Sequence, residues 1–227
     1  MSDKRLHIAV IPDGNRRWAK QRRLLPWNGH DAAFGVVRSL LEWCQRQGNI
    51  AIFTLWCFST ENWRRDTIEI THLMQLLETY LQQERPRFLR DKIRLLHSGR
   101  TDRIPTSLRQ LIEDMSTETE HFTDFIFHMA LDYGGQDEIS RGITRAVAAG
   151  ERVFTPEVVR GYVDQPGLPD IDLIIRTSGE QRTSNFFLWQ AAYAEWFFVP
   201  TFFPDFTPSA LAHVVTDFLQ RECRFGQ

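Results

Sequence analysis

Two polar segments hold most of the side chains that could do chemistry, and each follows a short apolar run. Residues 13–18 follow the apolar run at residues 8–11, and residues 176–185 follow the run at residues 171–175. Each segment turns through glycine into a stretch that can begin a helix, where free backbone N–H groups and arginine side chains attract phosphate. Two such segments predict two phosphorylated substrates, which favours a transferase.

The first segment combines one carboxylate with five cations. Its residues are Asp13, Gly14, Asn15, Arg16, Arg17 and Trp18, and Lys20, Arg22 and Arg23 follow. Cations this close repel one another unless an anion binds among them, although a solvated basic face fits the pattern too. Asp13 is placed to hold Mg²⁺ carried by a diphosphate, because this ion takes one or two carboxylates together with phosphate oxygens. A plain strand-to-helix turn is the alternative.

The second segment contains Arg176 and Arg182, with the Ser184 hydroxyl beside them. Together these groups can hold one diphosphate from several sides, although surface ion pairs with Glu180 fit as well. Further along the chain, Glu195 is a lone acid in an apolar run. A buried carboxylate needs a cation or hydrogen-bond donors beside it. Two roles therefore fit Glu195, that of a metal ligand and that of a partner in a structural ion pair.

Polar side chains also follow the apolar run at residues 50–58, namely Ser59, Glu61, Asn62, Trp63 and Arg65. Carboxylate, amide and hydroxyl groups at the end of a strand can orient a substrate or accept a proton. Their position in a loop favours a functional role over simple solvation. His30 follows Gly29 at a predicted helix start near the basic segment, although a lone histidine is more often structural than catalytic.

The elements that must position these residues alternate between strand and helix. Strands are predicted at residues 6–11, 50–58, 93–97, 125–131 and 171–175, with a sixth near 196–199. These runs are apolar without alternation, which is typical of strands buried on both faces of a parallel sheet. Apolar residues at helical spacing fall between them, including a helix at about residues 67–90. We therefore expect one α/β layered domain, with ligands at the carboxyl ends of its strands.

Composition excludes several classes of protein. The chain of 227 residues fits a single domain over residues 1–227, and its net charge of −2 argues against nucleic acid as a partner. Three cysteines without a CxxC pair fit a reducing compartment, so we expect a cytoplasmic protein. No apolar run is long enough to span a membrane, which leaves only a transient contact with a membrane surface open. No P-loop, HExxH, GxSxG, DDxxD or GxGxxG motif occurs.

Motifs along nearly the whole chain resemble one family, the cis-prenyltransferases, also called undecaprenyl or Z-isoprenyl diphosphate synthases. They lie at residues 7–15, 29–30, 58–63, 133–135, 172–177, 184–186, 188–190, 193–195, 204–206 and 224–226. The resemblance implies a single α/β domain with a six-stranded, mainly parallel sheet surrounded by helices, an apolar substrate tunnel and a homodimer. It also implies that isopentenyl diphosphate condenses with an allylic diphosphate to form a cis double bond, with Mg²⁺ as cofactor.

The resemblance assigns roles to individual residues. It implies that Asp13 and Glu195 bind the metal, that Gly14, Asn15 and Arg17 cradle the allylic diphosphate, and that Arg176, Arg182 and Ser184 bind isopentenyl diphosphate. Asn62, Ser59 and His30 are implied to lie near the reacting carbons, together with the catalytic Asp13. Glu69 is the implied acid on a mobile helix, and residues 224–226 resemble a tail that reaches the partner's site. We also expect substrate contacts from Arg16, Trp18, Arg22, Glu61, Trp63 and Arg65.

The chain departs from the family pattern at a few positions. Pro26 stands where the family usually has an arginine that helps hold the allylic diphosphate. Two alternatives are open: Arg22 or Arg23 takes the place of that arginine, or the donor binds differently. Arg16, Asp66, Gln136 and Ser178 also replace the family's usual residues. These changes bear on the identity of the allylic donor more than on the class of reaction.

The expected product is short- or medium-chain, because Cys57, with Trp56 beside it, stands where long-chain relatives often keep a smaller residue along the tunnel. In addition, no insertion follows Glu69. Three alternatives stay open: a long-chain polyprenyl diphosphate synthase for a carrier lipid, irregular coupling of two five-carbon diphosphates, and a non-catalytic subunit of a heteromeric enzyme. The carboxylate and arginine set favours catalysis, and residues 59–63 favour elongation, whereas Pro26 keeps the last two alternatives open.

Overall fold

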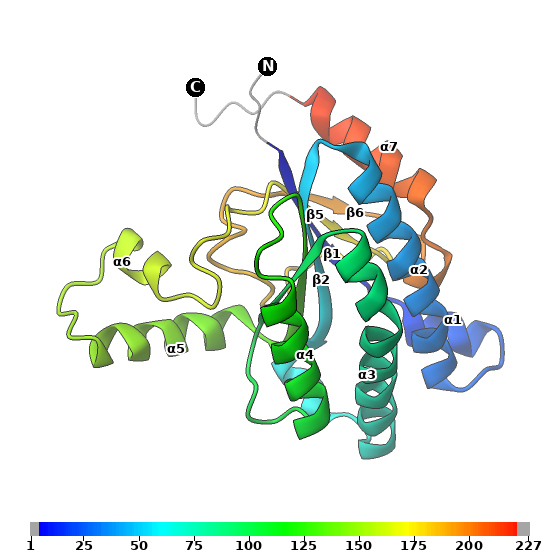
Figure 1. Cartoon of the computed structure of the whole chain (residues 1–227). Helices are drawn as coiled ribbons and strands as arrows, with labels where there is room; N and C mark the ends of the chain where they lie inside the picture. The colour runs from blue at the N-terminus through cyan, green and yellow to red at the C-terminus, as the bar shows by residue number, and fades with distance from the viewer. Residues whose placement is uncertain (1–4, 222–227) are drawn as a thin grey trace.

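The structure is a computed structural model that describes residues 5–221, and a six-stranded sheet lies at its centre (Figure 1). The strands are β1 (Leu6–Ile11), β2 (Ile50–Ser59), β3 (Ile93–Ser98), β4 (Phe125–Tyr133), β5 (Leu173–Arg176) and β6 (Glu195–Phe198). Their order is β3-β4-β2-β1-β5-β6, and every neighbouring pair is parallel. The predicted α/β fold is confirmed, including its sixth strand.

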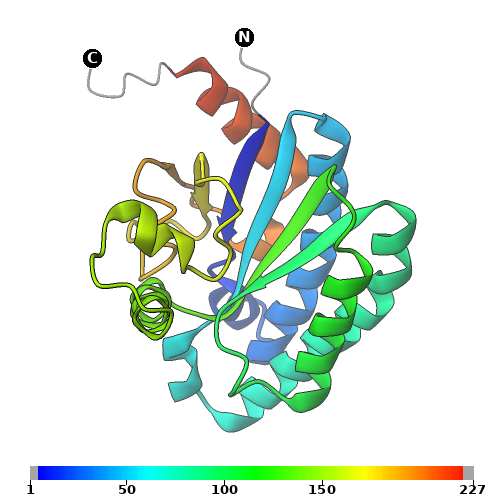
Figure 2. The ribbon, with the colours of Figure 1, turned by 60° about the vertical axis from the view of Figure 1, so that its left-hand side comes forward.

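Helices cover both faces of this sheet. Within residues 5–221 they are α1 (Asn15–Gln21), α2 (Pro26–Gln47), α3 (Thr67–Arg90), α4 (Thr106–Glu118), α5 (Gly135–Ala148), α6 (Pro156–Gly161) and α7 (Pro208–Gln220), with short 3-10 helices η1 (Thr60–Arg64) and η2 (Phe203–Asp205). Figure 2 shows α2, α3 and α4 along one face, and α5 and α6 on the other side. No helix of this described part is long and apolar enough to cross a membrane.

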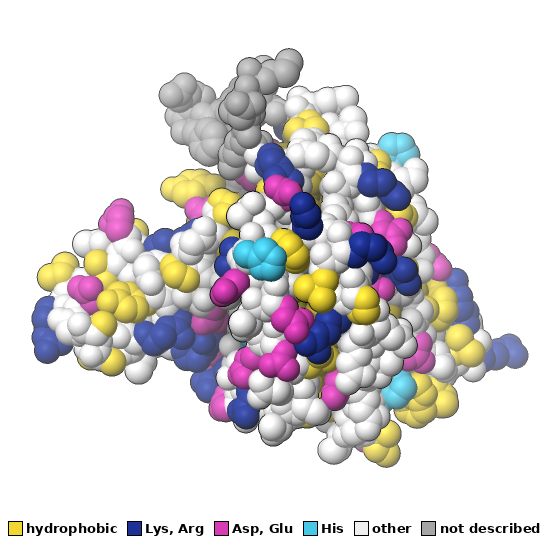
Figure 3. Space-filling model, viewed as in Figure 1, with side chains coloured by type: hydrophobic (Ala, Val, Ile, Leu, Met, Phe, Trp, Pro, Cys, Tyr) yellow, Lys and Arg dark blue, Asp and Glu magenta, His cyan; other side chains and the backbone are white. Residues whose placement is uncertain are grey.

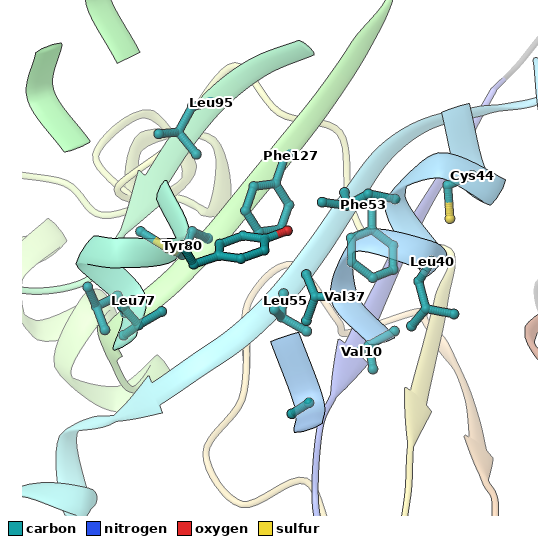
Figure 4. Close-up of a cluster of buried hydrophobic side chains, with 14 of the residues drawn as sticks. Val10, Val37, Leu40, Cys44, Phe53, Leu55, Leu77, Tyr80, Leu95 and Phe127 are labelled. Atoms are coloured by element: carbon teal, nitrogen blue, oxygen red, sulfur yellow. The ribbon is translucent and has the colours of Figure 1, made fainter. Parts of the chain in front are cut away.

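The larger core lies between the sheet and helices α2, α3, α4 and α7. Alternate strand residues supply it, because successive side chains of a strand point to opposite faces. Ile8 and Val10 of β1 belong to this core, whereas Ala9 and Ile11 belong to a smaller core on the other face. Figure 4 shows side chains of α2 and α3 meeting those of the central strands, with Phe127 beside Tyr80. Burial on both faces explains why the strands lack polar alternation.

The smaller core is covered by the connection from β5 to β6 rather than by a long helix. Phe186 and Phe187 of this connection pack on the sheet, where Phe187 stacks on Tyr133 with ring centroids 4.2 Å apart. This connection also carries the second polar segment of the sequence. Packing of its aromatic residues therefore holds the polar residues beside them at the sheet edge.

Side-chain caps stabilise the starts of three helices. The Asp66 carboxylate accepts a hydrogen bond from the Ile68 N–H at the start of α3, and Thr155 and Thr207 cap α6 and α7 in the same way. Strand β5 begins at Leu173, two residues later than predicted. There the Ile171 N–H bonds to the Gln190 carbonyl instead of to a neighbouring strand.

Candidate active site

The polar segments converge because three neighbouring strands, β2, β1 and β5, end at the same edge of the sheet. From β1 the chain builds outward on one side as far as β3, and then returns to add β5 and β6 on the other side. Such a switch in strand order is where open α/β sheets bind ligands. A cleft of about 790 Å³ opens at this edge. It is lined by Ile11, Pro12, Asp13, Gly14, Asn15, Arg16, Arg17, His30, Trp56, Cys57, Phe58, Ser59, Glu61, Asn62, Arg65, Leu73, Arg176, Arg182, Ser184 and Asn185.

Asp13 and Arg176 join the two polar segments across adjacent strand ends. The Arg176 Nη2 group donates to Asp13 Oδ2 at 2.8 Å, and the Gly14 N–H donates to Asp13 Oδ1 at 2.7 Å. Burial opposes ionisation of Asp13, but the hydrogen bond and charge of Arg176 outweigh it, so the pKa of Asp13 lies below its ordinary value. Asp13 is therefore a carboxylate at neutral pH and a fit ligand for a hard cation.

The start of α1 forms one side of the cleft. Gly14 caps this helix with φ 101°, and a Cβ atom there would lie 2.6 Å from the Phe202 ring, so only glycine fits. The free N–H groups of the first turn follow it. Arg17 extends across this helix start, donating to Ser178 Oγ at 2.6 Å and lying 3.0 Å from Glu180. This side can hold one diphosphate.

The second side of the cleft is built around the buried Arg176 guanidinium. Its Nη1 group donates to Ser184 Oγ at 2.7 Å and to the Arg182 carbonyl at 2.6 Å. Ser178, Ser184 and Asn185 all have positive φ, between 52° and 74°, an uncommon conformation that gathers at ligand sites. The Arg182 side chain is more than half exposed and pairs with Glu180, so the surface ion pair left open by the sequence is present.

A third group of polar residues lies between these two sides, after β2. Asn62 Oδ1 accepts from the Ser59 N–H at 3.2 Å, and Asn185 Nδ2 donates to Glu61 Oε1 at 3.1 Å. His30 faces this group from α2. Helices α1 and α2 approach so closely that a Cβ atom at Gly29 would lie 2.1 Å from the Asn15 carbonyl oxygen, so this position needs glycine. The structure thus brings Ser59, Asn62 and His30 to one cleft, as predicted.

Glu69 lies behind the cleft wall at the start of α3, where it contacts the side chains that do line the cleft. Its carboxylate lies 3.5 Å from His30 Nε2, 3.3 Å from Arg65 and 3.7 Å from Arg16. The His30 contact and then the two arginine charges lower the pKa of Glu69, although burial opposes them. Glu69 therefore ties α3 to three residues of the cleft.

Besides Glu69, four predicted site residues do not line the cleft. The Trp18 indole N–H and the Arg22 guanidinium both bond to Asp205, and Trp63 donates to Asp132 Oδ1 at 2.8 Å. Glu195 begins β6 and lies beside Leu173, at the opposite end of the strand from Arg176, where it pairs with Arg221 at 3.0 Å. The sequence analysis left a structural ion pair of Glu195 as an alternative, and this ion pair is present. The role of Glu195 as a metal ligand stays a prediction. The predicted tail at residues 224–226 lies outside the described residues.

Sequence reasoning missed three residues around this site. Asn185 lines the cleft and bonds to Glu61, and its place next to Ser184 was the available signal. Asp132 and Arg103 lie behind η1, where Arg103 pairs with the fully buried Asp132. Nothing local in the sequence links these two residues, because they are brought together only by the pairing of β3 and β4.

An apolar tunnel continues from the cleft between α2 and α3. It shares Asn15, His30, Cys57 and Leu73 with the cleft and adds Phe34, Val37, Leu77 and Tyr80, together with strand residues such as Phe127. Its enclosed space is about 50 Å³. The site therefore joins a cationic opening to an apolar channel, which suits a ligand with a charged head and a hydrocarbon chain.

Comparison with known proteins agrees with this geometry. Residues 11–226 match the family model described as putative undecaprenyl diphosphate synthase. The chain belongs to this cis-prenyltransferase family. An isoprenyl transferase of Helicobacter hepaticus is 41% identical over 97% of this chain and 96% of its own length, and one of Bacillus anthracis is 40% identical over 97% and 87%. The protein is therefore a cis-isoprenyl transferase, which sets aside the non-catalytic alternative.

Two solved structures share the fold over the whole chain. Lavandulyl diphosphate synthase from Lavandula x intermedia, in complex with dimethylallyl diphosphate, is 28% identical with a TM-score of 0.93 and covers 99% of both chains. A probable undecaprenyl diphosphate synthase from Campylobacter jejuni is 31% identical with a TM-score of 0.84 and covers 100% of both chains. This cis-prenyltransferase thus resembles proteins named for both short and long products.

Proposed function

We propose that this cis-prenyltransferase joins isopentenyl diphosphate to an allylic diphosphate and repeats the step to make a long-chain polyprenyl diphosphate. The observation that carries the proposal is the single cleft with two arginine-lined sides that meet at Asp13 and continue into an apolar tunnel. Two sides suit two diphosphates, and the tunnel suits the growing chain.

In the proposed reaction the C–O bond of the allylic diphosphate breaks, and the diphosphate leaves with the electron pair. The C4 atom of isopentenyl diphosphate forms the new bond to the allylic carbon, and a proton is then lost from its C2 atom. Arg17 and the N–H groups of α1 hold the leaving diphosphate, where positive charge stabilises the transition state. Arg176, Arg182 and Ser184 hold the diphosphate of the second substrate.

Mg²⁺ is part of this proposal, and the chemistry of the residues fits it. No group of three or more His, Cys, Asp or Glu side chains gathers as a metal site within residues 5–221. Mg²⁺ needs no such group, since it commonly binds one or two carboxylates together with substrate phosphates. Asp13 is the residue that would hold it, and the ion would add positive charge at the leaving diphosphate.

The comparisons favour a long-chain product over the short- or medium-chain product expected from Trp56 and Cys57. The matching family model carries the name of an undecaprenyl synthase, and so does the structure from Campylobacter jejuni. Trp56 does not line the tunnel, because it packs against Phe186 of the smaller core with ring centroids 4.9 Å apart. Only Cys57 of the pair reaches the tunnel.

We also propose that the protein works as a homodimer in a reducing compartment such as the cytoplasm. Helices α5 and α6 project from the body (Figure 1), and exposed apolar side chains lie on and near them, including Ile143, Val147, Phe154 and Tyr193. A second copy would cover this surface. Measurement of the protein's mass in solution tests the homodimer, and Val147→Glu should yield monomers.

The free thiols of Cys44 and Cys57 support the proposed reducing compartment.

The proposed function is tested with purified protein, labelled isopentenyl diphosphate and dimethylallyl, geranyl or farnesyl diphosphate, each with and without Mg²⁺. We expect a ladder of dephosphorylated products in steps of one isoprene unit, ending at long chains, and no products in the presence of a chelator. Products that stop after one or two additions would overturn the long-chain assignment and restore the short-chain one.

Irregular coupling of two five-carbon diphosphates is the second candidate. The high structural similarity to lavandulyl diphosphate synthase favours it, as does Pro26 at an unusual position. Against it, residues 59–63 retain the elongation motif, and Ser59 and Asn62 line the cleft. Incubation with dimethylallyl diphosphate alone separates the two, because only irregular coupling gives a ten-carbon product without isopentenyl diphosphate.

A further inference from the structure

The connection between α1 and α2 presents apolar side chains to solvent beside the cleft. Leu24 is 46% exposed and Leu25 is 54% exposed, and Ile68 in the first turn of α3 is 70% exposed. Side chains of this size are normally buried. In Figure 3 hydrophobic side chains gather at the lower right, over the start of α3 and the connection between α1 and α2.

These residues belong to one surface, because α2 and α3 contact each other at their first turns. The Trp27 ring lies 6.0 Å from the His72 ring, and Asp31 lies 3.1 Å from His72. Ile68 precedes His72 by four residues and therefore occupies the same face of α3. We call the surface formed by Lys20, Arg23, Leu24, Leu25, Trp27 and Ile68 the basic-apolar tip.

The chain segment that forms most of the basic-apolar tip, residues 14–30, carries only positive charges. Residues 14–30 contain five Lys or Arg residues and no Asp or Glu. Arg16, Arg17 and Arg22 lie in ion pairs with Glu69, Glu180 and Asp205. Lys20 and Arg23 are exposed and make no ion pair within residues 5–221. Two free cations beside exposed leucines and a tryptophan are the combination by which proteins bind anionic lipid surfaces.

A second copy of the chain fits this surface less well than a lipid. In a twofold dimer the same patch meets itself, so the cations of the two copies would face one another. The neutral apolar surface on α5 and α6 is a better site for a second copy, and it lies on the far side of the sheet from α3 (Figure 2).

The place of the basic-apolar tip in the fold connects it to the tunnel. Helices α2 and α3 both begin at the tip, and their following turns line the tunnel through Ala33, Phe34, Leu73 and Leu77. Movement of the two helix starts would open the tunnel next to whatever the tip binds. We propose that the basic-apolar tip docks the enzyme on an anionic lipid membrane, where a long apolar product can leave without crossing water.

Sedimentation of the whole protein with vesicles tests this proposal in the absence of substrates. Vesicles of equal parts phosphatidylglycerol and phosphatidylcholine should bind the protein, vesicles of phosphatidylcholine alone should bind it weakly, and added salt should release it. Arg23→Glu should weaken partition at least about fivefold, since each cation near such a surface contributes about that factor. The matched control is Arg152→Glu, which removes an exposed arginine elsewhere.

The apolar part is tested with a double variant, Leu25→Ser with Ile68→Ser, against the control Leu89→Ser with Leu219→Ser. All four side chains are at least 40% exposed, but only the first two belong to the basic-apolar tip. The tip variants should lose vesicle binding and keep elongation activity in vesicle-free buffer, whereas the control variants should keep both. Equal vesicle binding by all variants, absence of binding by the wild type, or a change of oligomeric mass in the tip variants would each overturn the proposal. The vesicle-binding assay needs no turnover. Failure of the membrane-docking proposal can therefore be distinguished from failure of the proposed long-chain product.

Discussion

At the scale of single residues, Asp13 carries the strongest prediction. Asp13→Ala removes the cleft carboxylate that contacts Arg17 on one side and Arg176 on the other, so turnover should fall by at least about a hundredfold. The fold should survive, because Arg176 keeps its bonds to Ser184 and the Arg182 carbonyl. Steady-state rates and a thermal unfolding curve measure the two effects, with exposed Asp102→Ala as the control. Activity that survived would contradict the metal-binding role of Asp13.

A second residue-scale prediction concerns Asp132, which lies outside the cleft. It is fully buried with φ 52°, and it accepts hydrogen bonds from Trp63 in η1 and from Arg103. Asp132→Ala leaves the Trp63 N–H unpaired and the Arg103 charge without its partner, so the free energy of unfolding should fall by about 3 kcal/mol. Urea titration measures this change.

Asp132 should also affect catalysis by positioning η1, which presents Asn62 to the cleft. Asp132→Asn keeps an acceptor for Trp63 but loses the charge opposite Arg103, so kcat should recover more than stability does. If Asp132→Ala and Asp132→Asn lose kcat in proportion to their stability, the role is structural only. Rates at a temperature where both variants are folded separate these outcomes.

How far the site could be predicted depends on whether its residues follow a strand directly. Ser59 and Arg176 end their strands and Asp13 lies two residues after β1, so predicting the strands was enough to place them. Trp18, Arg22 and Trp63 belong to the right segments but point toward Asp205 and Asp132, because helical and 3-10 turns direct neighbouring side chains to opposite sides. The spacing of a motif does not show to which side of a turn each side chain points.

At the scale of elements, a row of buried polar side chains crosses four strands of the sheet. His7 Nδ1 donates to the Pro169 carbonyl, and the row continues through Thr54 and His128 to Ser98, with contacts of 2.7, 3.0 and 2.8 Å. Because the Pro169 carbonyl only accepts, Thr54 donates to His7 Nε2, His128 Nδ1 donates to Thr54, and Ser98 donates to His128 Nε2. In this arrangement both histidines are neutral.

The row predicts acid sensitivity of the fold. Burial lowers the pKa of His7 to about 4, and it also lowers that of His128. The unfolded chain binds these protons near pH 6.5 and the folded chain does not, so stability is present above that pH and is lost as the pH falls toward 4. His7 alone should remove about 3 kcal/mol. Unfolding free energies across this range measure it.

His7→Gln tests the assignment, since an amide keeps a donor and an acceptor but does not titrate. This variant should show a flatter dependence of stability on pH than the wild type, whereas the exposed His121→Gln should leave the curve unchanged. An unchanged curve for His7→Gln would show that other groups cause the acid sensitivity.

The elements themselves were predictable because their signals are local. Continuous apolar runs marked the strands, and a Thr–Pro pair stands at the start of both α6 and α7. The shifted start of β5 was not predictable, since the backbone of Ile171 bonds to Gln190 in a connection that comes later in the chain. Strand order and the placing of residues 177–194 over the smaller core likewise depend on contacts between distant segments.

At the scale of the whole molecule, the tunnel must expand to hold a long product. Its enclosed space of about 50 Å³ has room for about four water-sized groups. The rings of Phe34 in α2 and Tyr80 in α3 meet across it with centroids 4.9 Å apart. Elongation to the proposed long product would therefore require α2 and α3 to move apart, and this movement would break the contact between the two rings.

Tyr80 provides the prediction that follows. Its ring reaches toward Phe127 and Val37 (Figure 4), and its buried hydroxyl has no hydrogen-bond partner within residues 5–221. Tyr80→Ala should lengthen the mean product, because it removes the ring between the two helices, and it should lower the free energy of unfolding by about 3 kcal/mol. Tyr80→Phe keeps the ring and removes only an unpaired hydroxyl, so product length should stay the same and stability should not fall. Mass spectrometry of the dephosphorylated products measures the product length of both variants.

The control for lowered stability alone is Phe88→Ala, because Phe88 is buried on α3 but does not line the tunnel. Equal product lengths in the wild type and Tyr80→Ala would show that the contact between the Phe34 and Tyr80 rings does not limit chain growth.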